Sequence, residues 1–186
     1  SSFSNKYTIT LNKNGGTNTP TASVIATYAK STLSPSSITI AEKAYTISGF
    51  GLASSRKSNG ASVSSSQTIT SKAPFNRWCT DTTSGVQIMN NQVAVALLTN
   101  KTRYTDSSGR WSRTTDITLY AQYGTLPEMT LPTITKTGYN CGWTTASNGT
   151  TITYASGGKL RPSANVTLYG VCIPNTYTVT FNANGG

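Results

Sequence analysis

Residues 7–16 read YTITLNKNGG and residues 177–186 read YTVTFNANGG, so the end of the chain repeats its beginning. Seven of these ten positions are identical, and two of the three differences keep an apolar side chain. Large and small side chains alternate in both segments, and Thr favours strands, so each segment predicts a β-strand. The Asn-Gly-Gly that follows supplies the positive-φ residues of a tight turn. A recurrence of this kind predicts a repeat protein.

A second pair of similar segments lies between these two copies. Residues 116–120 read DITLY and residues 165–169 read NVTLY, which is the same polar, β-branched, Thr-Leu-Tyr pattern. Each is preceded by an aromatic segment that contains Trp, FNRWCT at 75–80 and YNCGWTT at 139–145. The same order of motifs therefore occurs twice, and we expect two related modules built mainly from β-strands.

These motifs divide the chain into a long module, a short module and the start of a third. We expect the long module at residues 1–123, the short module at 124–175 and the opening strand of a further repeat at 176–186. Residues 124–131 contain Pro and have no clear period, so they predict a linker between the modules. Only residues 91–98 could form a short helix. We expect residues 176–186 to pair with the short module or with a neighbouring chain.

The composition argues against an enzyme. The chain has 15 Lys and Arg, five Asp and Glu and no His, and only 11% of its residues are charged. General acid–base catalysis relies mostly on His or paired carboxylates, and zinc sites need clusters of His, Cys or carboxylates. We therefore predict no catalytic residues, no metal site and no cofactor. The longest apolar run, 93–98, is too short to cross a bilayer. Since the sequence starts at Ser1 without Met, we expect a processed product or an excised fragment.

The ordered motifs resemble the Listeria–Bacteroides repeat family, which includes the B-repeat modules of internalin-like bacterial surface proteins. The openings at 7–16 and 177–186 carry this resemblance, together with TGYNCGW at 137–143 and the closing TLYAQY at 118–123 and TLYGVC at 167–172. The resemblance implies β-grasp-like modules of about four strands, which is enough for a stable sheet with one packed face. It also implies a location outside the cell, at the cell surface or secreted.

The resemblance implies a structural or adhesive role without catalysis. The partners would be neighbouring repeats of the same or adjacent chains, with anionic wall polymers or glycans as candidate ligands, and no nucleic acid is expected. Two alternatives stay open: a subunit of an extracellular filament or pilus, and an adhesin module that binds polyanions or glycans. Two features depart from the family pattern. Residues 29–74 have no counterpart in an ordinary unit, and Tyr123 and Cys172 stand where Trp is usual.

The expected location outside the cell leads to a prediction for the three cysteines. Cys141 lies in the middle segment of the short module and Cys172 lies in its closing segment. Because oxidising compartments favour disulfides, we predict a bond between them that staples a module with little core. The alternative is a pair of buried free thiols. Cys79 would stay unpaired, as a packed apolar side chain or a link to another chain.

A basic segment is the candidate ligand site. Five residues crowd into a short stretch that contains one acid: Lys101, Arg103, Arg110, Trp111 and Arg113. The segment has two interpretations. It is either a solvated hairpin, or a polyanion-binding patch with Trp111 stacked on the ligand. The net charge of +10 fits both, since it attracts polyanions and also keeps a polar surface soluble.

Overall fold

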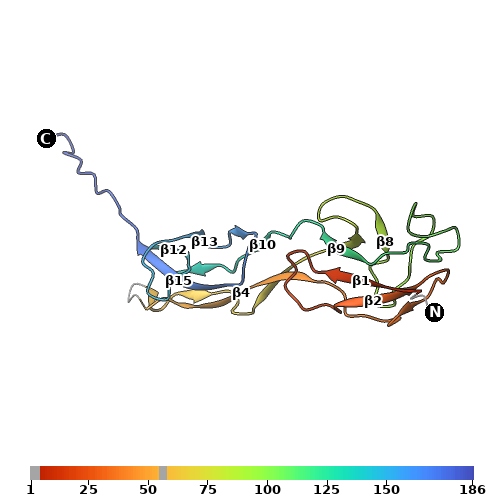
Figure 1. Cartoon of the computed structure of the whole chain (residues 1–186). Helices are drawn as coiled ribbons and strands as arrows, with labels where there is room; N and C mark the ends of the chain where they lie inside the picture. The colour runs from red at the N-terminus through yellow and green to blue at the C-terminus, as the bar shows by residue number, and fades with distance from the viewer. Residues whose placement is uncertain (1–4, 55–57) are drawn as a thin grey trace. The chain divides into compact units, whose positions relative to one another are not determined.

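The fold is known from a computed structural model, which describes residues 5–54 and 58–186 (Figure 1). The described residues form a mainly β protein without an α-helix. They divide into two compact units: the first contains Ser1–Ala44 and Lys72–Pro127, and the second contains Tyr45–Ser71 and Glu128–Gly186. Residues 91–98, where the sequence allowed a short helix, form bends and isolated bridges instead.

The first unit is built on a six-stranded sheet in the order β3-β2-β1-β9-β7-β8. Its strands are β1 (Lys6–Asn12), β2 (Ser23–Thr27), β3 (Leu33–Ser34), β7 (Phe75–Cys79), β8 (Gln87–Met89) and β9 (Ile117–Tyr123). Strand β1 pairs antiparallel with β2 and parallel with β9, so Ile9 lies opposite both Val24 and Ile117. The opening motif therefore becomes a central strand, although more than a hundred residues separate it from β9.

One face of this sheet supplies the core of the first unit. Because side chains alternate across a strand, Ile9 and Leu11 point to the same face and are buried, while Thr10 between them is exposed. Trp78 and Trp111 are completely buried in the same apolar cluster. The remaining buried members of the cluster come from six further segments: Val24, Ala26, Leu33, Ile38, Ala41, Ile88, Met89, Leu97, Leu119 and Ala121.

The second unit is built on a five-stranded sheet in the order β13-β12-β15-β4-β6. Its strands are β4 (Lys43–Leu52), β6 (Ile69–Ala73), β12 (Tyr139–Thr144), β13 (Tyr154–Ala155) and β15 (Val166–Pro174). Two small sheets join β5 (Ser62–Val63) to β11 (Ile134–Thr135), and β10 (Met129–Thr130) to β14 (Lys159–Leu160). Trp143 is fully buried in the core and contacts the ring of Phe50 edge-on at 5.3 Å between centroids.

The two sheets repeat one arrangement of strands. The order β2-β1-β9-β7-β8 in the first unit corresponds to β6-β4-β15-β12-β13 in the second. In each, an opening strand runs parallel to a closing strand, which pairs antiparallel with the strand that carries Trp. Trp78 lies opposite Ala121, and Trp143 lies opposite Gly170, the matching position of the second closing strand.

One hydrogen bond recurs at the same place in both sheets. The backbone N–H of Thr8 donates to Oδ1 of Asp116 at 2.9 Å, and the N–H of Thr46 donates to Oδ1 of Asn165 at 2.9 Å. The side chain just before each closing strand therefore fixes the start of its opening strand. This places Tyr45-Thr-Ile-Ser as the counterpart of Tyr7-Thr-Ile-Thr, so β4 is the opening strand of the second unit.

The chain alternates between the units, which differs from the predicted modules. It crosses from one unit to the other after residues 44, 71 and 127. The last crossing lies inside the predicted linker at 124–131, but residues 45–71, assigned from sequence to the long module, group with the second unit. The physical reason is pairing at long range, because β4 forms its parallel ladder with β15, from Ile47 opposite Val166 to Leu52 opposite Gly170.

The last eleven residues repeat the opening turn without its strand. The N–H of Asn14 donates to Oδ1 of Asn12 at 2.8 Å, and the N–H of Asn184 donates to Oδ1 of Asn182 at the same distance. Residues 176–181, however, have no ladder partner among the described residues, and Phe181 is 92% exposed. The expected pairing of this segment with the short module is therefore not seen in this chain.

Candidate functional site

A disulfide joins the two cysteines that the sequence analysis paired. Cys141 on β12 and Cys172 on β15 are direct cross-strand partners, and their Sγ atoms are 2.06 Å apart. Both residues are buried, with 6% and 1% of their surfaces exposed, and both belong to the core of the second unit. The bond therefore cross-links the strand that carries Trp to the closing strand from inside the core.

The first unit has an aromatic pair at the corresponding place. Phe75 on β7 lies opposite Tyr123 on β9, and their ring centroids are 5.9 Å apart. Cys79, on the same strand as Phe75, is a buried free thiol. Burial raises the pKa of the Cys79 thiol, although the positive charges of Arg77 and Lys101 oppose this effect. A thiol with a raised pKa is a poor nucleophile, so the structure gives Cys79 a packing role.

The basic segment contains a buried tryptophan rather than an exposed one. Trp111 is completely buried, and it forms isolated bridges with Tyr28 and Thr105. Its ring lies beside that of Tyr104, with 6.3 Å between centroids. A ligand cannot stack on a side chain that is covered on all sides. The hypothesis that Trp111 is the stacking platform of a polyanion site is therefore wrong, because the core of the first unit takes up this ring.

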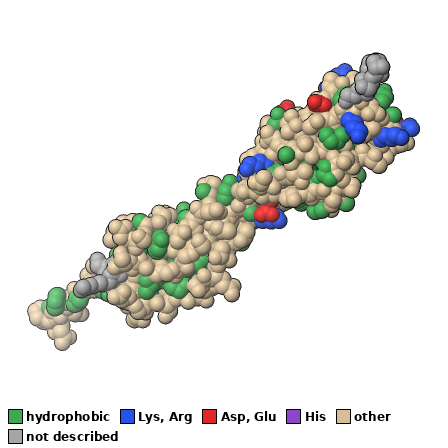
Figure 2. All heavy atoms as spheres, turned by 60° about the horizontal axis from the view of Figure 1, so that its bottom comes forward, with side chains coloured by type: hydrophobic (Ala, Val, Ile, Leu, Met, Phe, Trp, Pro, Cys, Tyr) green, Lys and Arg blue, Asp and Glu red, His purple; other side chains and the backbone are tan. Residues whose placement is uncertain are grey.

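Two of the four cations of this segment are engaged within the protein. Arg110 forms a salt bridge with Asp106 at 2.8 Å, and the guanidinium of Arg113 lies 4.7 Å from the ring centroid of Tyr104. The N–H of Arg110 also donates to Asp106, and this bond is the largest cause that lowers the pKa of that carboxyl group. Arg103 is exposed and Lys101 is partly buried. On the face shown in Figure 2, Lys and Arg side chains lie at several separate places rather than in one continuous patch.

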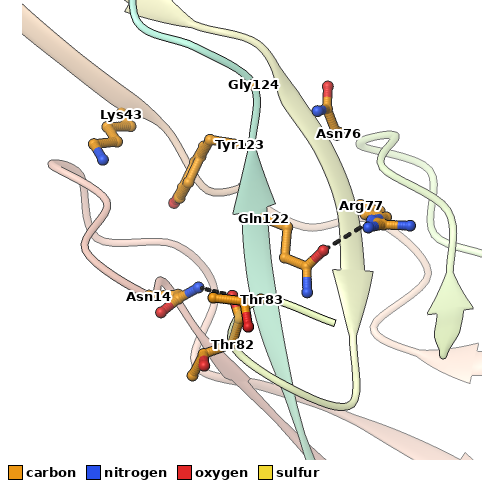
Figure 3. Close-up of a pocket in the computed structure, with 9 residues that line it drawn as sticks. All are labelled: Asn14, Lys43, Asn76, Arg77, Thr82, Thr83, Gln122, Tyr123 and Gly124. Atoms are coloured by element: carbon orange, nitrogen blue, oxygen red, sulfur yellow. Dashed lines mark hydrogen bonds between the residues drawn. The ribbon is translucent and has the colours of Figure 1, made fainter. Parts of the chain in front are cut away.

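A polar cleft of about 570 Å³ lies in the first unit, where β1 turns away from β9. The last residues paired between these strands are Asn12 and Tyr120, but β9 continues to Tyr123. The end of β9 therefore has no β1 residue beside it. The cleft is lined by residues from five segments of the first unit: Asn14, Lys43, Asn76, Arg77, Thr82, Thr83, Gln122, Tyr123 and Gly124. Figure 3 shows Tyr123 toward Lys43 and Gln122 toward Arg77, across the end of β9.

Hydrogen bonds fix the walls of this cleft. Asn14 has a positive φ of 46° at the turn after β1, and its Nδ2 donates to the carbonyl oxygens of Thr82 and Ala121 at 2.8 Å each. Gln122 is 8% exposed; its Nε2 donates to the carbonyl oxygens of Asp81 and Ser84, and its Oε1 accepts from Nε of Arg77 at 2.8 Å. These two amides tie the loop 81–84 to the end of β9.

Tyr123 forms part of the cleft wall as a neutral phenol. Its hydroxyl donates to the carbonyl oxygen of Lys13 at 2.6 Å, and Nζ of Lys43 lies 5.9 Å from the ring centroid. Partial burial raises the pKa of Tyr123 to about 12. At neutral pH its ring is therefore an uncharged aromatic surface beside a cation.

Sequence reasoning missed this cleft, although two signals for it were present. Asn in the turn Asn14-Gly-Gly has a side chain that can bond to nearby backbone, and Gln122 interrupts the closing strand with a polar residue. Neither signal identifies the partners, which lie 68 and 107 positions from Asn14 and about 40 positions from Gln122. No group of three or more His, Cys, Asp or Glu residues in the described part of the chain could hold a metal ion. No helix in that part is long and apolar enough to cross a membrane.

Comparison with known proteins identifies part of the chain. Residues 123–171 match the family model of the Listeria-Bacteroides repeat domain. This confirms the resemblance that the sequence motifs indicated. No curated protein and no solved structure gives a significant match to the chain.

The segment that matches the Listeria-Bacteroides repeat domain lies mainly in the second unit. It spans β10 to β14 and most of β15, and it stops one residue before Cys172. The opening strand β4 lies outside it, about 70 residues earlier in the chain. The matched segment therefore contains the strand that carries Trp143 and most of the closing strand, but not β4 and β6, which complete their sheet.

Proposed function

We propose that this chain is a non-catalytic, extracellular repeat region of a bacterial surface protein, which acts as a structural stalk or an adhesive module. The observation that carries this proposal is the repetition of one sheet, with the same strand order and the same Thr-to-Asx hydrogen bond in both units. Each unit is then one β-grasp-like repeat module. Repetition extends the reach of a protein without adding chemistry, which is what a stalk requires.

Two further features support a location outside the cell. The matched family is typical of bacterial surface proteins, and the disulfide between Cys141 and Cys172 forms most readily in an oxidising environment. The absence of catalysis is supported by composition: the chain is poor in charged residues, and its five acids are too few and too scattered along the sequence for paired carboxylate catalysis.

Antibody labelling of intact source cells tests the proposal. An antibody against the purified chain should label intact cells, and brief protease treatment of those cells should remove the signal while a cytosolic marker protein is retained. Labelling that needs permeabilised cells would contradict an extracellular role.

A filament subunit is a second candidate function, because of the last residues of the chain. Tyr177, Val179 and Phe181 are 72%, 73% and 92% exposed, and they repeat the apolar positions of β1. An exposed apolar segment of strand-forming residues can pair with the sheet of another chain. Sedimentation of the full chain over a wide concentration range tests this. Oligomers that disappear in Val179→Asp/Phe181→Asp would support the filament, whereas a monomer at every concentration would exclude self-assembly through this segment.

A further inference from the structure

The cleft at the end of β9 has a positive lining. Lys43 and Arg77 are among the residues that line it, and none of its nine lining residues is an acid. The two acids nearest in sequence have other partners. Glu42 forms a salt bridge with Lys72 at 3.3 Å, and the carboxylate of Asp81 accepts from the N–H of Thr82 at 2.7 Å. An anionic group in the cleft would therefore meet cations and no opposing carboxylate of the lining.

The rest of the lining suits a hydroxyl-rich ring. Asn76, Thr82 and Thr83 are exposed, and their amide and hydroxyl groups can donate and accept hydrogen bonds. Tyr123 adds one aromatic ring, with Lys43 beside it. The volume of about 570 Å³ lies within the range of small-ligand sites. One aromatic ring in a bounded cleft, with Trp111 buried elsewhere, does not form the row of platforms that a single-stranded nucleic acid requires.

The cleft is also held in shape before any ligand arrives. The amides of Asn14 and Gln122 bond to backbone carbonyls of the loop 81–84, and the hydroxyl of Tyr123 bonds to the Lys13 carbonyl. A site whose walls are fixed loses less conformational entropy on binding. In the second unit, Cys172 in its disulfide occupies the place that corresponds to Tyr123, so the aromatic ring is not repeated at that position.

We propose that this cleft binds an anionic saccharide, with Lys43 and Arg77 attracting its acidic groups from the two sides of β9 and Tyr123 contacting a sugar ring. The inference rests on the adhesive form of the proposed function, for which it names the ligand class and the site. The two can fail separately: a chain that labels on intact cells but binds no saccharide would remain a stalk, and saccharide binding by a chain confined to the cytosol would leave the site without the adhesive role.

Titration calorimetry on the full chain at low ionic strength tests the site with three probes. Digalacturonate carries both ring and carboxylate, cellobiose carries rings without charge, and sodium sulfate supplies an anion without a ring. We expect digalacturonate to bind more tightly than either of the others. Sulfate binding as tight as digalacturonate binding would show that the ring contributes nothing, and no binding of digalacturonate would overturn the proposal.

Variants with equal loss of charge locate the site. Lys43→Gln/Arg77→Gln should weaken digalacturonate binding by about tenfold or more, since it removes two charge-assisted contacts. The control Lys30→Gln/Arg103→Gln removes two exposed cations of the same unit outside the cleft and should change affinity by less than about threefold. Equal weakening in both variants would mean that the charge of the whole unit, and not the cleft, attracts the ligand.

Because Arg77 also bonds to Gln122, the substitution of Arg77 could disturb the fold of the cleft. A measurement on the unaltered chain tests the site without this risk. Amide chemical-shift changes on addition of digalacturonate should centre on Thr82, Thr83 and Tyr123. Changes centred on residues 101–113 instead would place the ligand on the basic segment and overturn the assignment to the cleft.

Discussion

Removing the disulfide should destabilise the second unit and leave the first unchanged. Cys141 and Cys172 are 31 positions apart, so their bond closes a loop of that length in the unfolded chain. The chain-entropy model gives about 3.7 kcal/mol for such a loop. Cys141→Ala/Cys172→Ala also removes two buried sulfur atoms, which adds a packing cost, so 3.7 kcal/mol is the lower part of the expected range.

Hydrogen exchange followed by mass spectrometry resolves this effect by strand. Amides of β4, β12 and β15 should exchange several hundredfold faster in the double variant if they exchange through opening of the unit, because each 1.4 kcal/mol is a factor of ten. Amides of β1, β7 and β9 should keep their rates. Cys79→Ala is the matched control, since it removes a buried sulfur in the first unit without breaking a cross-link.

Two results would refute this reasoning in different ways. Exchange in β12 and β15 within about threefold of the unaltered chain would mean that the disulfide contributes little to folding. An equal acceleration in β1 and β9 would mean that the two units open together, so that the division into separately stable units does not describe the energetics.

Three other features give simpler tests. Deletion of residues 176–186 should leave the melting temperature within about 1 °C, because this segment buries almost no apolar surface, and a larger drop would show that it is packed. Asn14→Ala should lower the stability of the first unit by about 1–3 kcal/mol in urea unfolding, since two backbone carbonyls lose their donor. Asn184→Ala is its control, because Asn184 has a similar positive φ but its side chain makes no such bonds to β9 or the loop 81–84, and it should have no effect. Folding raises the pKa of Tyr123 from 10.0 to about 12, so its contribution to stability is full below pH 10 and is lost as the pH rises toward 12. The melting temperature of Tyr123→Phe should therefore fall less between pH 10 and pH 12 than that of the unaltered chain. An equal fall in both proteins would contradict this role of Tyr123.

The local strand patterns were readable from the sequence because they depend on near neighbours. Alternation in Tyr7-Thr-Ile-Thr-Leu puts Ile9 and Leu11 on one face, and the structure buries both. Trp78 and Trp143 lie within two segments with strand patterns, where a large aromatic side chain favours packing in a core, and both are fully buried. The Asn-Gly-Gly turn forms at both ends of the chain with the same hydrogen bond, even where the strand before it has no partner, so this turn is encoded locally.

What the sequence did not reveal was pairing across long distances. Tyr45-Thr-Ile-Ser carries the same alternation as the opening motif, but Gly49 and Gly51 interrupt the pattern, and the partner strand begins at Val166. The residues of an opening strand do not indicate which of the two closing strands it pairs with. The cleft could not be predicted from the sequence for the same reason, because its lining comes from segments that only the folded sheet brings together.

The alternation of the chain between its two units has a genetic consequence. Neither unit is a contiguous stretch of the sequence. A segment that contains the whole first unit also contains β4 and β6 of the second sheet. A segment that begins after residue 127 contains most of the second unit but lacks its opening strand β4. The smallest length of gene that can be copied and still fold is therefore the pair. The opening motif recurs after 170 positions, which is the length of that pair and not of one unit. Growth of such a protein by duplication would add units two at a time.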